Sequence, residues 1–406
     1  MFVKSQSFLF SVSKLFHQHQ QWRGMGAMTK VRLKWVKNKN LDHVIDTETD
    51  LKAACILKDA IKRSPTGITI RENFNCYWNK RYPTLFHEFP HARYASLPCF
   101  KLTDTALMLD SQEEIIHQSH EADTVERLCR VLMMMRSKTV SLRSLHSLKF
   151  DLGLPDNYEK TLVMKYPDHF CFVKASNGNP CLKLVKWRDE FAFSALQKRN
   201  EDNDVSGEES RYREFKRGQS TLTFPMSFPR GYGAQKKVKA WMDEFQKLPY
   251  ISPYDDPSNI DPESDLMEKR AVAVLHELLS LTIHKKTKRN YLRSMRAELN
   301  IPHKFTRLFT RYPGIFYLSL KCKTTTVILK EGYRRGKLVD PHPLTRLRDK
   351  FYHVMRTGFL YRARGLGMVS KEELLLDRPE DDLEEEGSEE EEIVEGSELE
   401  EDSEAE

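Results

Sequence analysis

The sequence predicts an α+β fold that is mainly helical, built from three helix-helix-helix-β-hairpin repeats and followed by a disordered acidic C-terminal tail. Three observations lead to this prediction. The stretch 292–330 repeats the earlier stretch 145–185 almost position for position. A basic residue followed by Tyr-Pro occurs in both stretches and once more upstream, at Arg81. Residues 371–406 differ abruptly in composition from the chain before them. Self-similarity at a fixed offset is the signature of repeated structural units.

The apolar positions of the two stretches define the helices of one repeat. Leu292, Met295 and Leu299 are spaced as one face of a helix, and Pro302 suits the first turn of a second helix. That second helix should stop before Tyr312, because a residue that precedes proline is pushed out of helical geometry. The matched pairs are Leu292 with Leu145, Met295 with Leu148, Leu299 with Leu152, Ile301 with Leu154, Pro302 with Pro155 and Phe305 with Tyr158.

A β-hairpin follows each helical pair. Residues 315–320 and 324–329 are rich in β-branched and aromatic side chains, and the earlier copy has strands at 170–174 and 181–185 around an Asn-Gly-Asn turn. Long amphipathic helices precede the copies, at about 49–62, 112–135 and 265–283. This order is winged-helix-like, and in such modules the third helix and the hairpin often contact nucleic acid. We expect repeat units at about 45–105, 112–187 and 263–332.

A generic α+β repeat explains the same pattern without any nucleic-acid contact. In that interpretation the Tyr-Pro landmarks at Tyr82, Tyr166 and Tyr312 are helix stops whose rings fill the core. We regard this structural role as the better explanation of the three tyrosines. The polar stretch 198–210 predicts a solvated linker, and apolar residues at helical spacing predict a further helix at about 234–246.

The first 40 residues contain no Asp or Glu, and basic residues are spaced among Ser, Gln, Phe and Leu. This composition is typical of an organelle transit peptide, which we predict over residues 1–28. The scarcity of Ser and Thr in the first ten residues favours the mitochondrion, with the chloroplast as the alternative. The basic segment 30–39 would then stay on the mature protein.

Several classes of protein are not indicated. No apolar run approaches the roughly 20 residues of a membrane span, so we expect no membrane partner. The seven cysteines never form Cys-x-x-Cys, so neither a disulfide framework nor a metal site is predicted. Phosphate-loop, dinucleotide, zinc-protease and nucleophile-elbow motifs are missing, so we expect no catalytic residues, no cofactor and no small-molecule substrate. Asp255-Asp256 resembles half of a nuclease metal site, but loop capping explains it better.

Charge is divided unequally along the chain. Residues 371–406 hold 20 of the 59 acidic residues and 2 of the 65 basic ones, so residues 1–370 carry about +24. A tail this acidic should be disordered. It would either compete with polyanions for the basic body or serve only to increase solubility. A body this basic favours a nucleic-acid partner. The candidate contact residues are Lys34, Trp35, Lys37, Lys39, Trp78, Lys80, Arg81, Lys236, Lys237, Lys285, Lys286, Lys288, Arg289, Arg293, Arg296, Arg334 and Arg335.

Several longer motifs together resemble the plant organelle RNA recognition domain proteins over residues 30–362. The resemblance implies RNA binding and promotion of group II intron splicing in organelles, with intron RNA and other splicing factors as partners and no catalytic residues. It assigns no individual RNA contact. An adaptor or scaffold of a splicing or ribosomal complex, and a nuclease, are the alternatives. The motifs are KVRLKWVKNKNLDHVI at 30–45, RYPTLF at 81–86, FPRGYG at 228–233, LPYISPYDD at 248–256, EKRAVAVLHELLSLT at 268–282 and RNYLRSMRAELNIP at 289–302.

Overall fold

The computed structural model describes most of the region between the basic N-terminal segment and the acidic tail. The predicted transit peptide before Met28, the acidic tail, Trp78, Lys80 and Arg81 lie outside the described residues. The described residues are 28, 30–31, 33–64, 68–69, 82–90, 98–205, 222–229, 232, 235–321 and 325–363.

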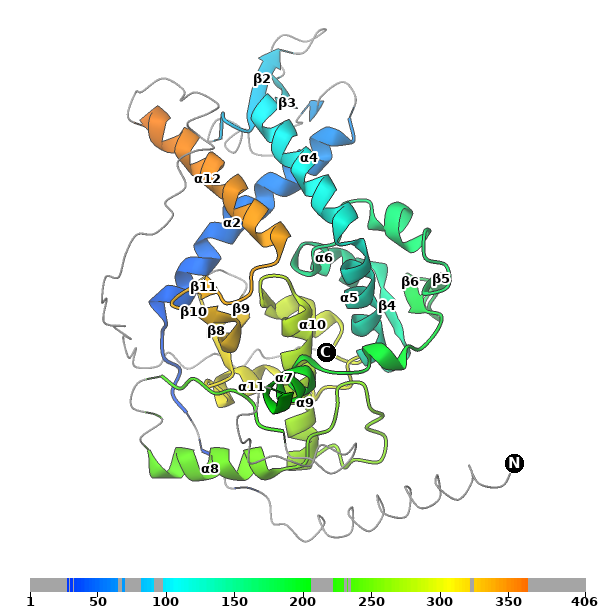
Figure 1. Cartoon of the computed structure of the whole chain (residues 1–406), viewed down its shortest axis with the longest axis vertical. Helices are drawn as coiled ribbons and strands as arrows, with labels where there is room; N and C mark the ends of the chain where they lie inside the picture. The colour runs from blue at the N-terminus through cyan, green and yellow to red at the C-terminus, as the bar shows by residue number, and fades with distance from the viewer. Residues whose placement is uncertain are drawn as a thin grey trace.

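The first segment of the chain forms a small sheet flanked by helices. Its elements are α2 (Lys39–Lys62), β1 (Ile68–Thr69), β2 (Phe86–Pro90), β3 (Pro98–Leu102) and α4 (Asp104–Ser119), joined by α12 (Pro343–Ala363) from the end of the chain. α2 begins earlier than predicted, because the Asn38 side chain accepts a hydrogen bond from the Leu41 amide and caps the helix. α12 packs against α2 and α4 (Figure 1). Leu109 and Met355 share the core that these helices enclose.

The second segment follows without a linker. Its elements are α5 (Glu121–Met134), β4 (Thr139–Ser141), α6 (Leu142–Leu152), a π-helical turn (Glu159–Val163), β5 (Phe170–Lys174) and β6 (Pro180–Leu184). The single helix predicted over 112–135 is wrong, because α4 and α5 meet at a break around His120. The two helices serve different cores: Leu109 of α4 is buried with α12, whereas Leu128 of α5 is buried in the larger core of the protein.

A connecting region separates the second segment from the third. It contains α7 (Ala195–Val205) and α8 (Lys236–Lys247). The linker predicted at 198–210 is wrong over its first half, since residues up to Val205 continue α7. Ser194 and Gln197 start this helix by a reciprocal cap, in which each side-chain oxygen accepts a hydrogen bond from the backbone amide of the other residue.

The third segment copies the second. Its elements are α9 (Asp265–Leu281), β7 (Lys286–Lys288), α10 (Arg289–Ser294), α11 (Thr306–Arg311), β8 (Phe316–Ser319) and β9 (Thr326–Leu329), with the short strands β10 (Tyr333–Arg334) and β11 (Lys337–Leu338) after them. An offset of 147 residues carries β4 onto β7 and carries Gly153 onto Asn300, both at positive φ. The helix-to-strand turns also agree, because Lys138 and Lys285 have φ of 56° and 51°.

Three three-stranded antiparallel sheets among the described residues have one topology. Their strand orders are β1-β3-β2, β4-β6-β5 and β7-β9-β8, so the first strand of each segment always pairs with the last. In the predicted hairpins, Phe170 pairs with Leu184 and Phe316 pairs with Leu329. The chain is therefore of mixed helix and sheet, as predicted, with small antiparallel sheets.

The predicted apolar faces are confirmed as core. Every residue of the matched pairs for which burial was predicted is at most 4% exposed, and Tyr82 and Tyr312 are 1% exposed. The larger core joins the second and third segments, and the first segment has its own core with α12. Among the described residues, no helix has the length and apolar content that crossing a membrane requires.

Candidate nucleic-acid interface

The N-terminal candidates lie on residues 33–38 and at the start of α2. We call residues 33–38 the strap; it packs against the third segment. Trp35 stacks on Tyr317 with ring centroids 6.1 Å apart, and its Nε1 donates to the Leu318 carbonyl over 2.8 Å. Asp42 fixes the strap further by accepting hydrogen bonds from the hydroxyls of Tyr317 and Ser319 over 2.9 and 2.5 Å. The Trp35 side chain therefore packs against the third segment of the protein itself. The nearby lysines reach solvent: Lys34 and Lys39 are exposed and Lys37 is half-buried.

Two predicted contacts point into the protein. Lys286 is 2% exposed, and its Nζ donates to the Val44 carbonyl over 2.9 Å. Lys285 closes the end of α9 by donating to the Ser280 carbonyl over 2.5 Å, and burial lowers its pKa. Lys138, at the equivalent turn of the second segment, donates to the Met133 carbonyl in the same way. Lys285 and Lys286 therefore have structural roles. Comparison with Lys138 at the equivalent turn would have identified Lys285 as a turn residue.

The remaining candidates of the third segment stay near the surface. Arg293 on α10 is exposed, whereas Lys288, Arg289 and Arg296 are half-buried. The basic surface continues beyond the predicted set onto the next turn and α11. His303, Lys304 and Arg307 are exposed there, and the sequence prediction missed all three. Their signal was available, because they alternate with the buried Phe305 and Leu308 on a helical period.

A second basic group forms where the start of α2 meets the turn between β10 and β11. Arg334 and Arg335 are exposed in the turn between β10 and β11, and Gly336 completes this turn at φ 77°. A Cβ on Gly336 would approach the Asn40 carbonyl oxygen to 3.2 Å, so this turn lies directly against the start of α2. The structure therefore brings Arg334 and Arg335 close to Lys39, which is far from both in the sequence.

The two candidates on α8 are separate from this group. Lys236 and Lys237 are exposed at the start of the helix, while its opposite face is buried. Figure 1 shows α8 at the lower edge of the molecule, away from β10 and β11. The predicted contacts thus form more than one patch.

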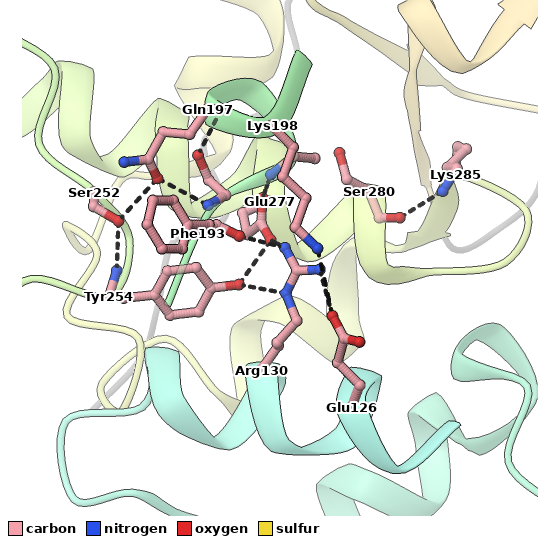
Figure 2. A network of polar contacts seen from close by, with 12 residues as sticks. Glu126, Arg130, Phe193, Gln197, Lys198, Ser252, Tyr254, Glu277, Ser280 and Lys285 are labelled. Atoms are coloured by element: carbon pink, nitrogen blue, oxygen red, sulfur yellow. Dashed lines mark hydrogen bonds and ion pairs between the residues drawn. The ribbon is translucent and has the colours of Figure 1, made fainter. Parts of the chain in front are cut away.

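A buried polar network connects the second and third segments (Figure 2). Glu277 on α9 is fully buried and accepts hydrogen bonds from Arg130, Tyr254 and the Ala195 amide, each over 2.7 Å. Arg130 also donates to the Phe193 carbonyl over 2.6 Å. These contacts join α5, α9 and the start of α7, so the second and third segments are fixed to each other.

The acidic pair in the proline-rich loop caps that loop, as predicted. Asp255 accepts from the Ser252 amide over 3.2 Å, and Asp256 accepts from the amide and hydroxyl of Ser258 over 3.1 and 2.6 Å. Within the described ranges, no group of three or more His, Cys, Asp or Glu side chains is arranged to hold a metal ion.

Residues 36–360 match the family model described as the plant organelle RNA recognition domain. Protein WHAT'S THIS FACTOR 9, mitochondrial, from Arabidopsis thaliana is 33% identical to this chain over 81% of the chain and 86% of that protein. Protein WHAT'S THIS FACTOR 1 homolog, chloroplastic, from Oryza sativa subsp. japonica is 28% identical over 86% of the chain and 70% of that protein. Protein ROOT PRIMORDIUM DEFECTIVE 1 from Arabidopsis thaliana is 30% identical over 64% of each. No solved structure matches the chain.

Proposed function

The chain belongs to the plant organelle RNA recognition domain family, and from that premise we propose that it binds organelle intron RNA and promotes the splicing of group II introns. In this proposal the three segments are winged-helix-like modules over residues 30–362 that form one RNA-binding body. The recurring strand order β1-β3-β2, β4-β6-β5 and β7-β9-β8 supports this architecture.

One structural observation carries the proposal. Three exposed basic residues of the third segment, Arg293, Lys304 and Arg307, lie on α10, on α11 and on the turn between them. In a winged-helix module, the second and third helices occupy these places, and the third helix commonly enters a nucleic-acid groove. Their charges would neutralise phosphates, which gives binding that weakens as salt rises.

The proposed role is to hold the intron in its folded form. The RNA would perform its own transesterification, and the protein would contribute no catalytic group. Phosphate contacts suit this task because they fix position and orientation along a folded RNA without reading its sequence. Shape recognition is the usual way in which proteins bind structured RNA.

We propose an organelle as the place of action, and the mitochondrion in particular. The support is the predicted transit peptide over residues 1–28 and the similarity to a protein named as mitochondrial. The similar proteins named as chloroplastic make the chloroplast the alternative. Import of a fluorescent fusion of the full chain distinguishes the two organelles directly.

An adaptor of a splicing or ribosomal complex is the second candidate, and exposed apolar side chains favour it. Met164, Phe172 and Val185 of the second segment are 69%, 44% and 53% exposed. Exposed apolar side chains are a feature of protein contact sites when they lie together on one surface.

Depletion of the protein tests the proposed function. The ratio of spliced to unspliced transcript should fall for a defined subset of organelle introns. RNA isolated after crosslinking to the full chain should contain the same introns. A splicing defect without crosslinked intron would favour the adaptor, and normal splicing of every intron would contradict the proposal.

A further inference from the structure

The second and third segments contact each other through reciprocal hydrogen bonds. The Ile283 amide donates to the Asp151 carbonyl over 2.9 Å, and the Arg136 amide donates to the Glu298 carbonyl over 2.6 Å. The 147-residue offset carries Arg136 onto Ile283 and Asp151 onto Glu298. The two hydrogen bonds are therefore equivalent. Exchanging the second segment for the third turns one bond into the other. Such reciprocity defines a two-fold, self-complementary interface, which is usually seen between two copies of a protein.

A pair of residues marks the axis of this internal two-fold. The same offset carries Arg130 onto Glu277, and these two side chains contact each other over 2.7 Å. In a two-fold interface, only a position at the axis meets its own equivalent. The packing of equivalent helices agrees, since α5 packs against α9 and α6 packs against α10.

The two-fold makes it possible to compare two equivalent surfaces in one chain. We call Arg293, Arg296, Lys304 and Arg307 the third corner; they lie on α10, α11 and the turn between them. The offset assigns the second corner as the equivalent positions, which are His146, Lys149, Asn157 and Lys160.

The second corner is used inside the protein. Asp156, next to its Asn157, pairs with Lys149 of the same corner and with Arg63 at the end of α2, where the Arg63 Nε to Asp156 Oδ2 distance is 3.0 Å. An acidic residue thus pairs with Lys149 and ties this corner to the first segment. The third segment has His303 in place of Asp156.

The third corner is more basic than the second. It carries four formal positive charges where the second corner carries two, and Arg293, Lys304 and Arg307 are exposed. Arg293 lies on α10, Arg307 lies on α11, and Arg296 and Lys304 lie in the turn between these helices.

We infer that RNA binds the third corner and not the second, which serves as the docking surface of α2; this inference rests on the proposed RNA-binding function. The RNA phosphate backbone is the ligand that fits these four cations, three of which are exposed. The third corner would thus contact RNA, while the equivalent second corner holds the first segment in place.

Two variants with equal loss of charge test this inference in the full chain. The first changes Arg293, Arg296, Lys304 and Arg307 to Gln. The matched control changes four exposed basic residues of the second segment to Gln, namely Arg143, Lys160, Lys174 and Lys183. Binding to one structured intron RNA is measured over a salt series, with thermal unfolding to verify that each variant is folded.

We expect the third-corner variant to lose about three units of the slope of log affinity against log salt, and at least about tenfold in affinity at low salt. The control should retain most of both. If the four-residue variant does not fold, the exposed pair Lys304→Gln and Arg307→Gln should give about half of the loss in slope. Equal losses in both variants, or a larger loss in the control, would overturn the inference and leave RNA binding intact. A wild-type chain that binds no RNA would overturn the proposed function together with it.

Discussion

The hydroxyl of Tyr312 donates a hydrogen bond to Glu268 over 2.6 Å and so ties the end of α11 to the start of α9. The same bond recurs in the other two segments, where Tyr166 donates to Glu121 over 2.6 Å and Tyr82 donates to Asp50 over 2.8 Å. The basic residue before the tyrosine pairs with the same acid in the two later segments, as Lys165 with Glu121 and Arg311 with Glu268. The basic-Tyr-Pro landmark is therefore a repeated structural clamp.

Tyr312→Phe should destabilise the protein by about 1–3 kcal/mol, because it leaves the buried side of Glu268 without a charge-assisted hydrogen bond. Urea unfolding measures this change. RNA affinity should not change, since Tyr312 is 1% exposed. The matched control is Tyr166→Phe, whose ring is less buried, and its cost should be smaller. An equal or larger cost for Tyr166→Phe would contradict this account of the clamp.

Arg130→Met should cost about 3–5 kcal/mol, because it leaves the buried Glu277 carboxylate without its cation. The double variant Arg130→Met with Glu277→Leu should be more stable than the single one, since no buried charge remains. The measurement is the free energy of unfolding of both variants. A double variant that is less stable than Arg130→Met would contradict the prediction. Arg143→Met, at an exposed site, serves as the control and should change stability by no more than about 0.5 kcal/mol.

Lys269 should make stability depend on pH above neutrality. It is fully buried and donates to the Gln246 and Leu248 carbonyls over 2.9 and 2.6 Å, and burial lowers its pKa from 10.5 to about 7. Above about pH 7 the unfolded chain holds a proton on this amine that the folded protein has lost. Stability from this group therefore rises with pH, by up to about 1.4 kcal/mol per unit, until the unfolded lysine also titrates.

Urea unfolding at pH 7.5 and 8.5 checks this prediction. Over that interval the wild type should gain about 1 kcal/mol more than Lys269→Met, in which the titrating group is gone. Comparing the two proteins removes the contributions of all other titrating groups. The same gain in both would mean that Lys269 does not titrate in this range.

Lys286→Met should lower stability and leave RNA binding unchanged. The substitution removes the hydrogen bond to the Val44 carbonyl, which costs about 1–3 kcal/mol when a buried acceptor loses its partner. The slope of RNA affinity against salt should match that of the wild type, because the ammonium group does not face solvent. A slope that falls by about one unit would instead place Lys286 among the phosphate contacts.

Periodicity predicted the core because burial follows local spacing. The apolar faces that contain Leu145 and Leu292 were identified in this way, and both residues are fully buried. The break at His120 could not be predicted, since it depends on α4 and α5 facing different cores, and the sequence alone does not say how many cores exist.

It was harder to predict which basic residues are exposed, because composition does not show which face of a strand is covered by another element. Lys286 and Trp35 were both predicted as contacts, yet Lys286 is buried and bonds to Val44 of α2, and Trp35 bonds to Leu318 of the third sheet. The missed residues Lys304 and Arg307 lie on the exposed face of a stretch whose aromatic residues Phe305 and Phe309 fill the core. The internal two-fold could not be predicted from the sequence either. The offset between the repeats defines which positions are equivalent, but only the contacts in the structure show that equivalent positions touch.

The central claim is that the basic body binds structured intron RNA. The most direct measurement is the affinity of the full chain for an organelle group II intron and for an unrelated structured RNA of equal length, over a salt series with Mg²⁺ present. Binding should weaken steeply with salt, should be tighter to the intron than to the unrelated RNA, and should leave the RNA uncleaved. Affinity for the intron no greater than for the unrelated RNA, or no dependence on salt, would contradict it.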